Sequence, residues 1–310
     1  MLDPRSSLVR HLSFLLFALT SSLLFWGPLR TLVQFARAHD FDSHIILVVP
    51  ISAYLIYRKR DEIFSNVSWG TALGVTLFLA GAILGLLATF NPHFNTGDAH
   101  LRVSVLALVI LWISGFVFCY GLPASRAARF PLLFLLLLIP IPDSIVGRAI
   151  ALLQEGSALV AFWLFKTLQV PVMREGMVFH VPSLDLEVAK QCSGIRSSVI
   201  LLVTTLLVAE FVLRSVWRKS VLVLSVIPIV ILKNGLRIVT ISLLTVYVSR
   251  SFLHSWLHQS GGIVFYLVGL LALLPILNLL KTSEMRGIEG RIGVAVRAAG
   301  RTSEDGESRV

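Results

Sequence analysis

The sequence contains two cysteines, and one of them stands in a polar context suited to chemistry. Cys192 lies in Gln191-Cys192-Ser193-Gly194, just before an apolar run that begins near residue 197. A thiol at a helix N-terminus has a lowered pKa, because the helix dipole and the unpaired backbone N–H groups favour the nucleophilic thiolate. Ser193 is suited to be the N-cap, and Gly194 would let a substrate backbone approach closely. The pattern predicts a cysteine nucleophile at Cys192.

Cys119 lies in a fully apolar stretch, residues 116–120, and is expected to be an inert buried side chain. The two cysteines are predicted at opposite ends of different membrane helices, about a membrane thickness apart. A disulfide requires Cα atoms within roughly 7 Å of each other, so both thiols are expected to be free.

A second group of polar residues interrupts a long apolar run further along the chain. Asn234 and Arg237 are three residues apart and therefore share one face of a helix, with Lys233 beside them. The arginine has a fixed fork of donors that suits a developing oxyanion, and Asn234 is suited to orient the arginine or a substrate carbonyl. Lys233 is interpreted as a lysine whose ammonium group reaches the membrane surface.

Two histidines, His254 and His258, are four residues apart, a spacing that lets two imidazoles share a metal ion on a helix. They lack the glutamate that follows the first histidine in the zinc-peptidase signature, so we predict no metal site and no cofactor. An imidazole titrates near neutral pH and can pass a proton to a leaving amine. His258 is the preferred partner of Cys192, and His254 is the alternative.

Glu187 is a supporting candidate, five residues before Cys192. It alternates with Leu186 and Val188 on a predicted strand, where its carboxylate could orient a histidine or an arginine. Two simpler interpretations stay open, namely a solvated strand charge and an ion pair with Lys190.

Membrane helices must position these candidates. Of the 310 residues, 56% are hydrophobic and 14% are charged, and the mean hydropathy is +0.84, well outside the usual balance of soluble domains. The net charge of +10 comes from lysines and arginines in short loops and the tail, which indicates membrane orientation and not a nucleic-acid partner. We expect an all-α polytopic membrane protein with about eight transmembrane helices. The apolar runs are residues 12–29, 44–57, 70–90, 103–120, 130–141, 145–168, 197–213, 221–248 and 263–280.

Basic residues set the expected orientation of these helices. The N-terminus and the C-terminus are both expected in the cytoplasm, because lysines and arginines gather on the cytoplasmic side. Cys192, Arg237 and His258 then lie near the extracytoplasmic ends of their helices. The basic clusters on the cytoplasmic side are at residues 58–60, 126–129, 214–219 and 281–291.

Two segments depart from simple spanning helices. Residues 130–168 must make one net crossing, so one of their two apolar pieces is expected to lie in the interface or to re-enter, with the break at Pro140 and Pro142. In residues 169–191 apolar and polar residues alternate, which predicts a short extracytoplasmic β-hairpin before the catalytic cysteine.

The arrangement resembles the exosortases and archaeosortases, which are multi-spanning transpeptidase-like enzymes. Their signature is a cysteine in a Cys-Ser-Gly context, an arginine in an Asn-x-x-Arg context on a later helix, and a histidine before a glycine in the last extracytoplasmic loop. The matching residues here are Cys192 with Ser193 and Gly194, Asn234 with Arg237, and His258 with Gly261. The likeness extends to Ser43-His44, Pro50 and the basic residues 58–60, and to Pro140 and Pro142.

The resemblance implies a membrane cysteine peptidase or transpeptidase that cleaves the C-terminal sorting signal of secreted proteins at the extracytoplasmic face of the cell (inner) membrane. Such a signal has a short motif such as Pro-Glu-Pro, a transmembrane helix and an Arg-rich end, often in bacteria that make exopolysaccharide. The expected partners are these secreted proteins and membrane lipids. Residues 1–280 are assigned to one exosortase-like transmembrane domain, and residues 281–310 to a basic, disordered cytoplasmic tail. The alternative is a transporter or export component for lipid-linked polysaccharide.

Overall fold

The computed structural model describes the backbone of residues 4–39, 42–91, 97–181, 184–187, 195–248 and 262–307. Within these ranges, the side chains of residues 4–6, 184, 186–187, 262 and 287–307 are not described. The chain divides into two compact units, Met1–Val146 and Gly147–Val310. Each unit has a hydrophobic core of its own.

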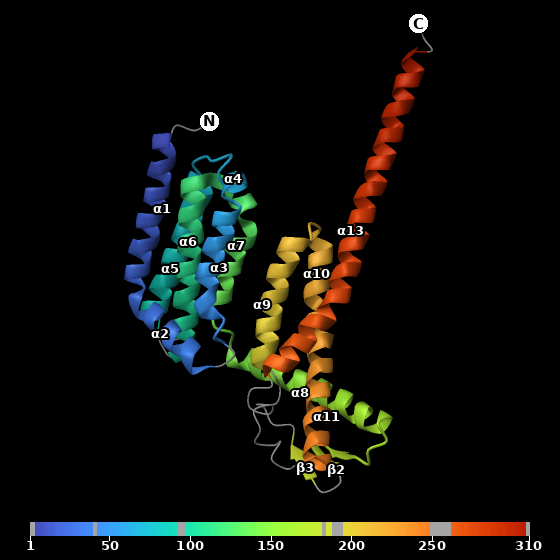
Figure 1. Ribbon diagram of the computed structural model, residues 1–310. Coiled ribbons are helices and arrows are strands. Elements are labelled where there is room, and N and C mark those ends of the chain that lie inside the picture. Colours follow the sequence, from blue (N-terminus) through green and yellow to red (C-terminus); the bar gives the residue numbers. More distant parts are fainter. Residues whose placement is uncertain are drawn as a thin grey trace. The chain divides into compact units, whose positions relative to one another are not determined.

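Helices make up most of the described backbone (Figure 1). Those of the first unit are α1 (Pro4–Leu24), α2 (Trp26–Ala38), α3 (Ile45–Arg58), α4 (Arg60–Ile63), α5 (Thr71–Phe90), α6 (Gly97–Ala127), α7 (Arg129–Phe134) and the 3₁₀ helix η2 (Leu135–Leu138). Helix α8 (Asp143–Thr167) begins in the first unit and continues into the second. It is followed by β1 (Met173–Glu175), β2 (Val178–Val181), β3 (Leu184–Glu187), α9 (Ile195–Val212), α10 (Val216–Leu224), α11 (Val226–Tyr247) and α13 (Gly262–Glu307).

Seven helices in the described part of the chain are long and apolar enough to cross a membrane. Two shorter apolar helices, Ile45–Arg58 and Arg129–Leu138, accompany them. Together they account for the nine apolar runs of the sequence, and the expected break at Pro140 and Pro142 falls between η2 and α8. The polytopic all-α fold is confirmed.

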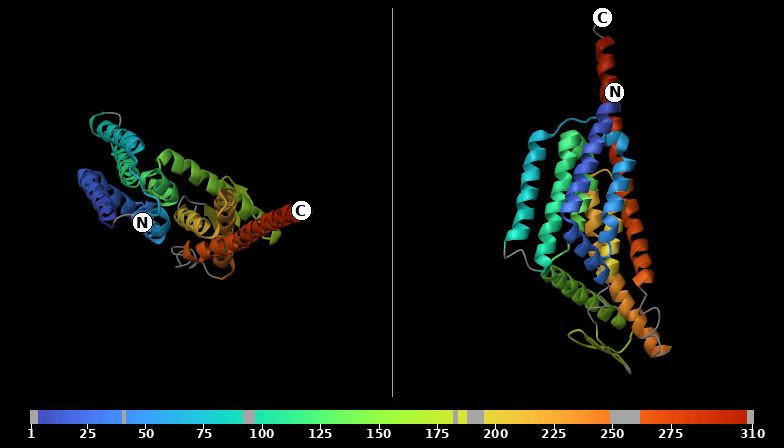
Figure 2. Two further views of the ribbon diagram at one scale, coloured as in Figure 1. Left: turned by 90° about the horizontal axis from the view of Figure 1, so that it is seen from above. Right: turned by 90° about the vertical axis from the view of Figure 1, so that its left-hand side faces the viewer.

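Helix α6 is the central helix of the first unit, and α1 and α5 pack along it (Figure 2). It is kinked at Gly121, where a φ of 78° and a ψ of 177° lie outside the helical range. The carbonyl of Cys119 lacks its helical donor here because Pro123 has no N–H. The buried Arg10 of α1 donates to this carbonyl at 2.7 Å, so the kink joins α1 to α6. Cys119 itself is a buried free thiol, as expected.

Gly121→Ala is expected to destabilise the first unit strongly. This φ and ψ strain any side chain, and an added Cβ would lie 2.2 Å from Ser68 Oγ and 2.7 Å from the Ser68 carbonyl oxygen. Ser68 is held in place because its N–H donates to the Tyr120 carbonyl at 3.1 Å. We expect a loss of about 3 kcal/mol, measured as a lower melting temperature of the purified protein in detergent. Gly147→Ala is the matched control, since a Cβ there meets nothing within 4 Å, and equal melting temperatures for the two variants would contradict the strain.

Asp42, just before α3, is an unusual buried acid. Its side chain is 1% exposed, and neither carboxylate oxygen has a hydrogen-bond partner in the described part of the chain. Burial raises the pKa of Asp42 from 3.8 to about 6; the charge of His39 opposes this shift and that of Asp143 adds to it. The carboxyl group of Asp42 therefore binds its proton more tightly in the folded protein than in the unfolded chain.

The contribution of Asp42 to stability is expected to fall as the pH rises from about 4 to about 7. Below a pH of about 3 the carboxyl group is protonated in both states, whereas above a pH of about 6 the folded state must bury a carboxylate. A shift of this size corresponds to about 3 kcal/mol at most. Asp42→Asn removes the titrating group at nearly constant shape, so its advantage in melting temperature over the wild type should grow across this range. A pH-independent difference would rule out the raised pKa.

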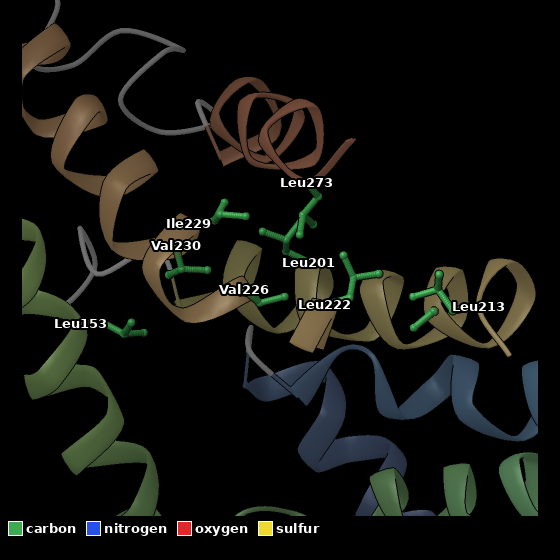
Figure 3. Packing of buried hydrophobic residues seen from close by; sticks show 9 residues of the cluster. Leu153, Leu201, Leu213, Leu222, Val226, Ile229, Val230 and Leu273 are labelled. Atoms are coloured by element: carbon green, nitrogen blue, oxygen red, sulfur yellow. The ribbon is translucent and has the colours of Figure 1, made fainter. Parts of the chain in front are cut away.

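The core of the second unit lies where α9, α10, α11 and α13 meet. Leu201 of α9, Leu222 of α10, Ile229 of α11 and Leu273 of α13 belong to one buried cluster, and Leu153 adds α8 to it (Figure 3). Helices α9, α11 and α13 are in mutual contact. This packing fixes the three helices that flank or carry the predicted site residues.

A small antiparallel sheet in the order β1-β2-β3 packs against α8 and α11. The predicted β-hairpin is therefore present, with one further strand. Phe179 of β2 is fully buried in a cluster with Phe165 of α8 and Val239 of α11. Arg174 of β1 also binds Glu155 of α8 at 2.7 Å. The sheet is thus attached to the helices of the second unit immediately before the cysteine-bearing segment.

Helix α13 is longer than the apolar run at residues 263–280. Its backbone is helical from Gly262 to Glu307 (Figure 1), because the charged residues that follow the apolar run include many good helix formers. Glu284 of this continuation accepts the backbone N–H groups of Arg214 at 3.0 Å and Ser215 at 2.7 Å, just before α10. No break in the described backbone marks the expected domain boundary at residue 280.

Candidate active site

Helix α11 carries two of the predicted site residues, Asn234 and Arg237. Asn234 is 1% exposed, and Arg237 is partly exposed about one turn later. Helix α11 approaches α8 closely here because position 235 is glycine: an added Cβ would lie 2.5 Å from Val160 Cγ1 and 2.8 Å from Val160 Cβ. The absent side chain of Gly235 thus sets how closely Asn234 and its neighbours approach α8.

Lys233 is 2% exposed, so its interpretation as a lysine that reaches the membrane surface is wrong. Its Nζ donates to Ser197 Oγ at 2.5 Å, and its Cδ lies 3.3 Å from the position a Cβ would take at Gly269 of α13. Helices α9 and α13 therefore cover the side chain. Ser197 is the third residue of α9 and follows Cys192 by five residues. A buried hydrogen bond thus joins α11 to the start of the helix that follows the cysteine.

The cysteine and its two neighbours lie outside the described residues. Cys192, Ser193 and Gly194 belong to the segment between β3 and α9. Glu187 is the last residue of β3; its backbone is paired with that of Val178, and its side chain is not described. The structure therefore places the elements on both sides of the cysteine, and the roles of these four candidates stay predictions.

Both candidate histidines also lie outside the described residues, in the segment 249–261 between α11 and α13. The preference for His258 over His254 accordingly stays a prediction. Of the predicted site residues, the structure brings Asn234 and Arg237 together on α11. It also brings α9 and α13, which follow the cysteine and the histidines in the chain, into contact with that helix.

A histidine–carboxylate pair that motif spacing does not reveal lies on the sheet. His180 Nδ1 of β2 is 2.7 Å from Asp185 Oδ1 of β3, and His180 Nε2 is 3.9 Å from Glu175 Oε2 of β1. His180 and Asp185 are direct cross-strand partners, so aligning the hairpin by its alternating pattern would have paired them. The three side chains connect the three strands of the sheet.

The described fold is that of a multi-pass α-helical membrane protein. The family described as transmembrane exosortase (Exosortase_EpsH) matches residues 35–275, well over half of the sequence, and the chain belongs to this family. The resemblance seen in the short motifs is thereby confirmed. Family membership supports a membrane transpeptidase-type role. No curated protein and no solved structure gives a significant match.

Proposed function

We propose that this protein is a membrane cysteine peptidase or transpeptidase that cleaves the C-terminal sorting signal of secreted proteins. The observation that carries the proposal is the family match, whose range includes Cys192, Arg237 and His258. The site on α11 adds support, because the helix that bears Arg237 is hydrogen-bonded through Lys233 to the first turn of the helix that follows Cys192.

In the proposed reaction, the Cys192 thiolate attacks the carbonyl carbon of the scissile peptide bond, and Arg237 donates hydrogen bonds to the oxyanion that forms. Asn234 orients the guanidinium group. The imidazolium of His258 then gives its proton to the leaving amine as the C–N bond breaks, which leaves a thioester between substrate and enzyme. Water or the amine of an acceptor attacks the thioester and gives a proton to His258. The products are a hydrolysed or transferred carboxyl group and the regenerated thiolate–imidazolium pair.

The proposed location of this chemistry is the extracytoplasmic face of the cell (inner) membrane, with both termini in the cytoplasm. The support is the distribution of lysines and arginines between alternate loops of the sequence. The transmembrane helix of the substrate would pack among helices of the enzyme, where small residues permit close approach. Its Arg-rich end would stay in the cytoplasm.

The proposal is tested by co-expressing the full chain with a secreted reporter that ends in a Pro-Glu-Pro motif, a transmembrane helix and an arginine cluster. The expected result is a shorter reporter whose new C-terminus, determined by mass spectrometry, lies at or beside the motif. A reporter with the same helix and arginines but a scrambled motif is the matched control. Processing should be blocked by thiol alkylation and should survive strong chelation.

Two outcomes would contradict the proposal. A reporter that stays full-length in the presence of the folded enzyme, across several motifs, would remove the peptidase function. Loss of polysaccharide export on deletion of the protein, with no reporter processed, would favour the transporter instead.

A further inference from the structure

Lys233 lies where three helices of the second unit meet. On α9, its Nζ donates to Ser197 Oγ at 2.5 Å. On α13, the position of a Cβ at Gly269 is 3.3 Å from Lys233 Cδ, 3.1 Å from Leu201 Cδ2 and 3.8 Å from Ile229 Cγ2. Leu201 and Ile229 belong to the apolar cluster shown in Figure 3. The ammonium group is therefore held by a serine hydroxyl beside an apolar core.

The three helices that meet at Lys233 are those that carry or follow the residues proposed for catalysis. Arg237 is about one turn further along α11, Cys192 precedes α9 by three residues, and the segment that contains His258 leads into α13. A chain spans at most about 3.6 Å per residue, so fixing the first turn of α9 limits how far Cys192 can lie from it. The packing around Lys233 therefore involves the helices that carry or follow all three groups.

A lysine in this position is costly for stability. The side chain is 2% exposed, and moving a cation from water into the protein interior costs several kcal/mol before its partners offset that cost. A methionine has a similar length and would fill the same space without that penalty. A structural role alone would be met better by an apolar side chain, so the charged, directed bond to Ser197 indicates a role in placing the first turn of α9.

We propose that Lys233, acting through Ser197, is a positioning residue that fixes the first turn of α9, the helix that follows Cys192 in the chain, against α11, the helix that carries Arg237. The inference rests on the proposed function, since it takes Cys192 as the nucleophile. Lys233 acts on the reaction through Ser197 and takes no proton from the substrate.

The test uses the full-length protein with Cys119→Ala, which leaves Cys192 as the only thiol. The alkylation rate of Cys192 by iodoacetamide is measured against pH, and reporter processing is measured in parallel. Lys233→Met removes the donor. The double variant Lys233→Met/Ser197→Ala removes both partners, so that no buried polar group of the pair is left unpaired if the single variant folds poorly. Lys166→Met, at an exposed lysine of α8, is the matched control.

We expect Lys233→Met and the double variant to move the alkylation profile to higher pH by about one unit, which slows alkylation at neutral pH about tenfold. Reporter processing should fall by a similar factor, and Lys166→Met should change neither quantity. An alkylation profile that matches the control would overturn the inference, whatever happens to processing.

Failure of the proposed function gives a different result. If a Cys192→Ala protein processes the reporter, the cysteine is not the nucleophile, and both proposals fall. If processing depends on Cys192 but the alkylation profile of Cys192 is the same in the Lys233 variants as in the control, the proposed function stands and only the positioning role is lost.

Discussion

Cys192→Ala and Cys192→Ser are each expected to abolish reporter processing, with a loss of at least about a thousandfold in rate. Alanine removes the nucleophile outright. Serine keeps the shape, but its hydroxyl is far less acidic than a thiol, so a helix N-terminus that favours a thiolate does not generate an alkoxide. The amount of processed reporter per unit of membrane-inserted enzyme is the quantity to measure. A serine variant with substantial activity would place the chemistry on another nucleophile.

Cys119 provides the matched control for this prediction. It is 4% exposed within a buried cluster of the first unit that also contains Phe116 and Tyr120. Cys119→Ala removes one small apolar group, so it should lower the melting temperature slightly and leave processing unchanged. Equal sensitivity of processing to both cysteine substitutions would show that the assay reports folding and not nucleophilic chemistry.

The membrane helices were predictable because their signal is local. A run of roughly 20 apolar residues must span the bilayer as a helix to satisfy its own backbone, so the runs at 70–90 and 197–213 closely match α5 and α9. The alternation in residues 169–191 likewise predicted the hairpin. The alternation of apolar and polar residues is visible within a single strand, without knowledge of the strand it pairs with. The end of α13 was not marked in this way, since loss of apolarity shows where lipid contact ends and not where a helix ends.

The features that the sequence did not reveal depend on contacts between distant residues. Lys233 is the eighth residue of α11, and only the arrival of α9 and α13 beside it decides that it is buried and bonded to Ser197. The kink at Gly121 also depends on a contact between residues that are far apart in the sequence. A glycine and a proline close together suggest a weak point, but the donor for the Cys119 carbonyl comes from Arg10, more than one hundred residues away.

The candidate site was predicted in part by residue chemistry and in part by resemblance. The spacing of Asn234 and Arg237 requires a shared helix face, and the structure confirms that both lie on α11. The grouping of Arg237 with Cys192 and His258 came from the order of the family motifs, since these residues are far apart in the chain. The chemistry of each side chain assigns it a role in the reaction. The role of Arg237 can be measured most directly, because oxyanion stabilisation has a distinct effect on the kinetics.

Arg237→Lys is expected to lower the rate of processing by about a hundredfold, and Arg237→Gln by up to about a thousandfold. Arginine offers two parallel N–H donors in a rigid plane to the oxyanion, whereas the lysine ammonium offers a point charge on a flexible chain. Because the oxyanion exists only in the transition state and the intermediate, the loss should appear in kcat with KM nearly constant. The measurement is steady-state cleavage of a peptide that carries the sorting motif by the purified enzyme in detergent.

The control for this prediction is Arg148→Lys, at an exposed arginine of α8 in the same unit, which should retain full activity. Melting temperatures of the Arg237 variants test whether the loss is chemical, since a variant that is as stable as the wild type loses activity without losing folded enzyme. A rise in KM with kcat unchanged would show that Arg237 binds the substrate in its ground state, for example through a carboxylate of the motif. In that case a donor other than Arg237 would have to stabilise the oxyanion.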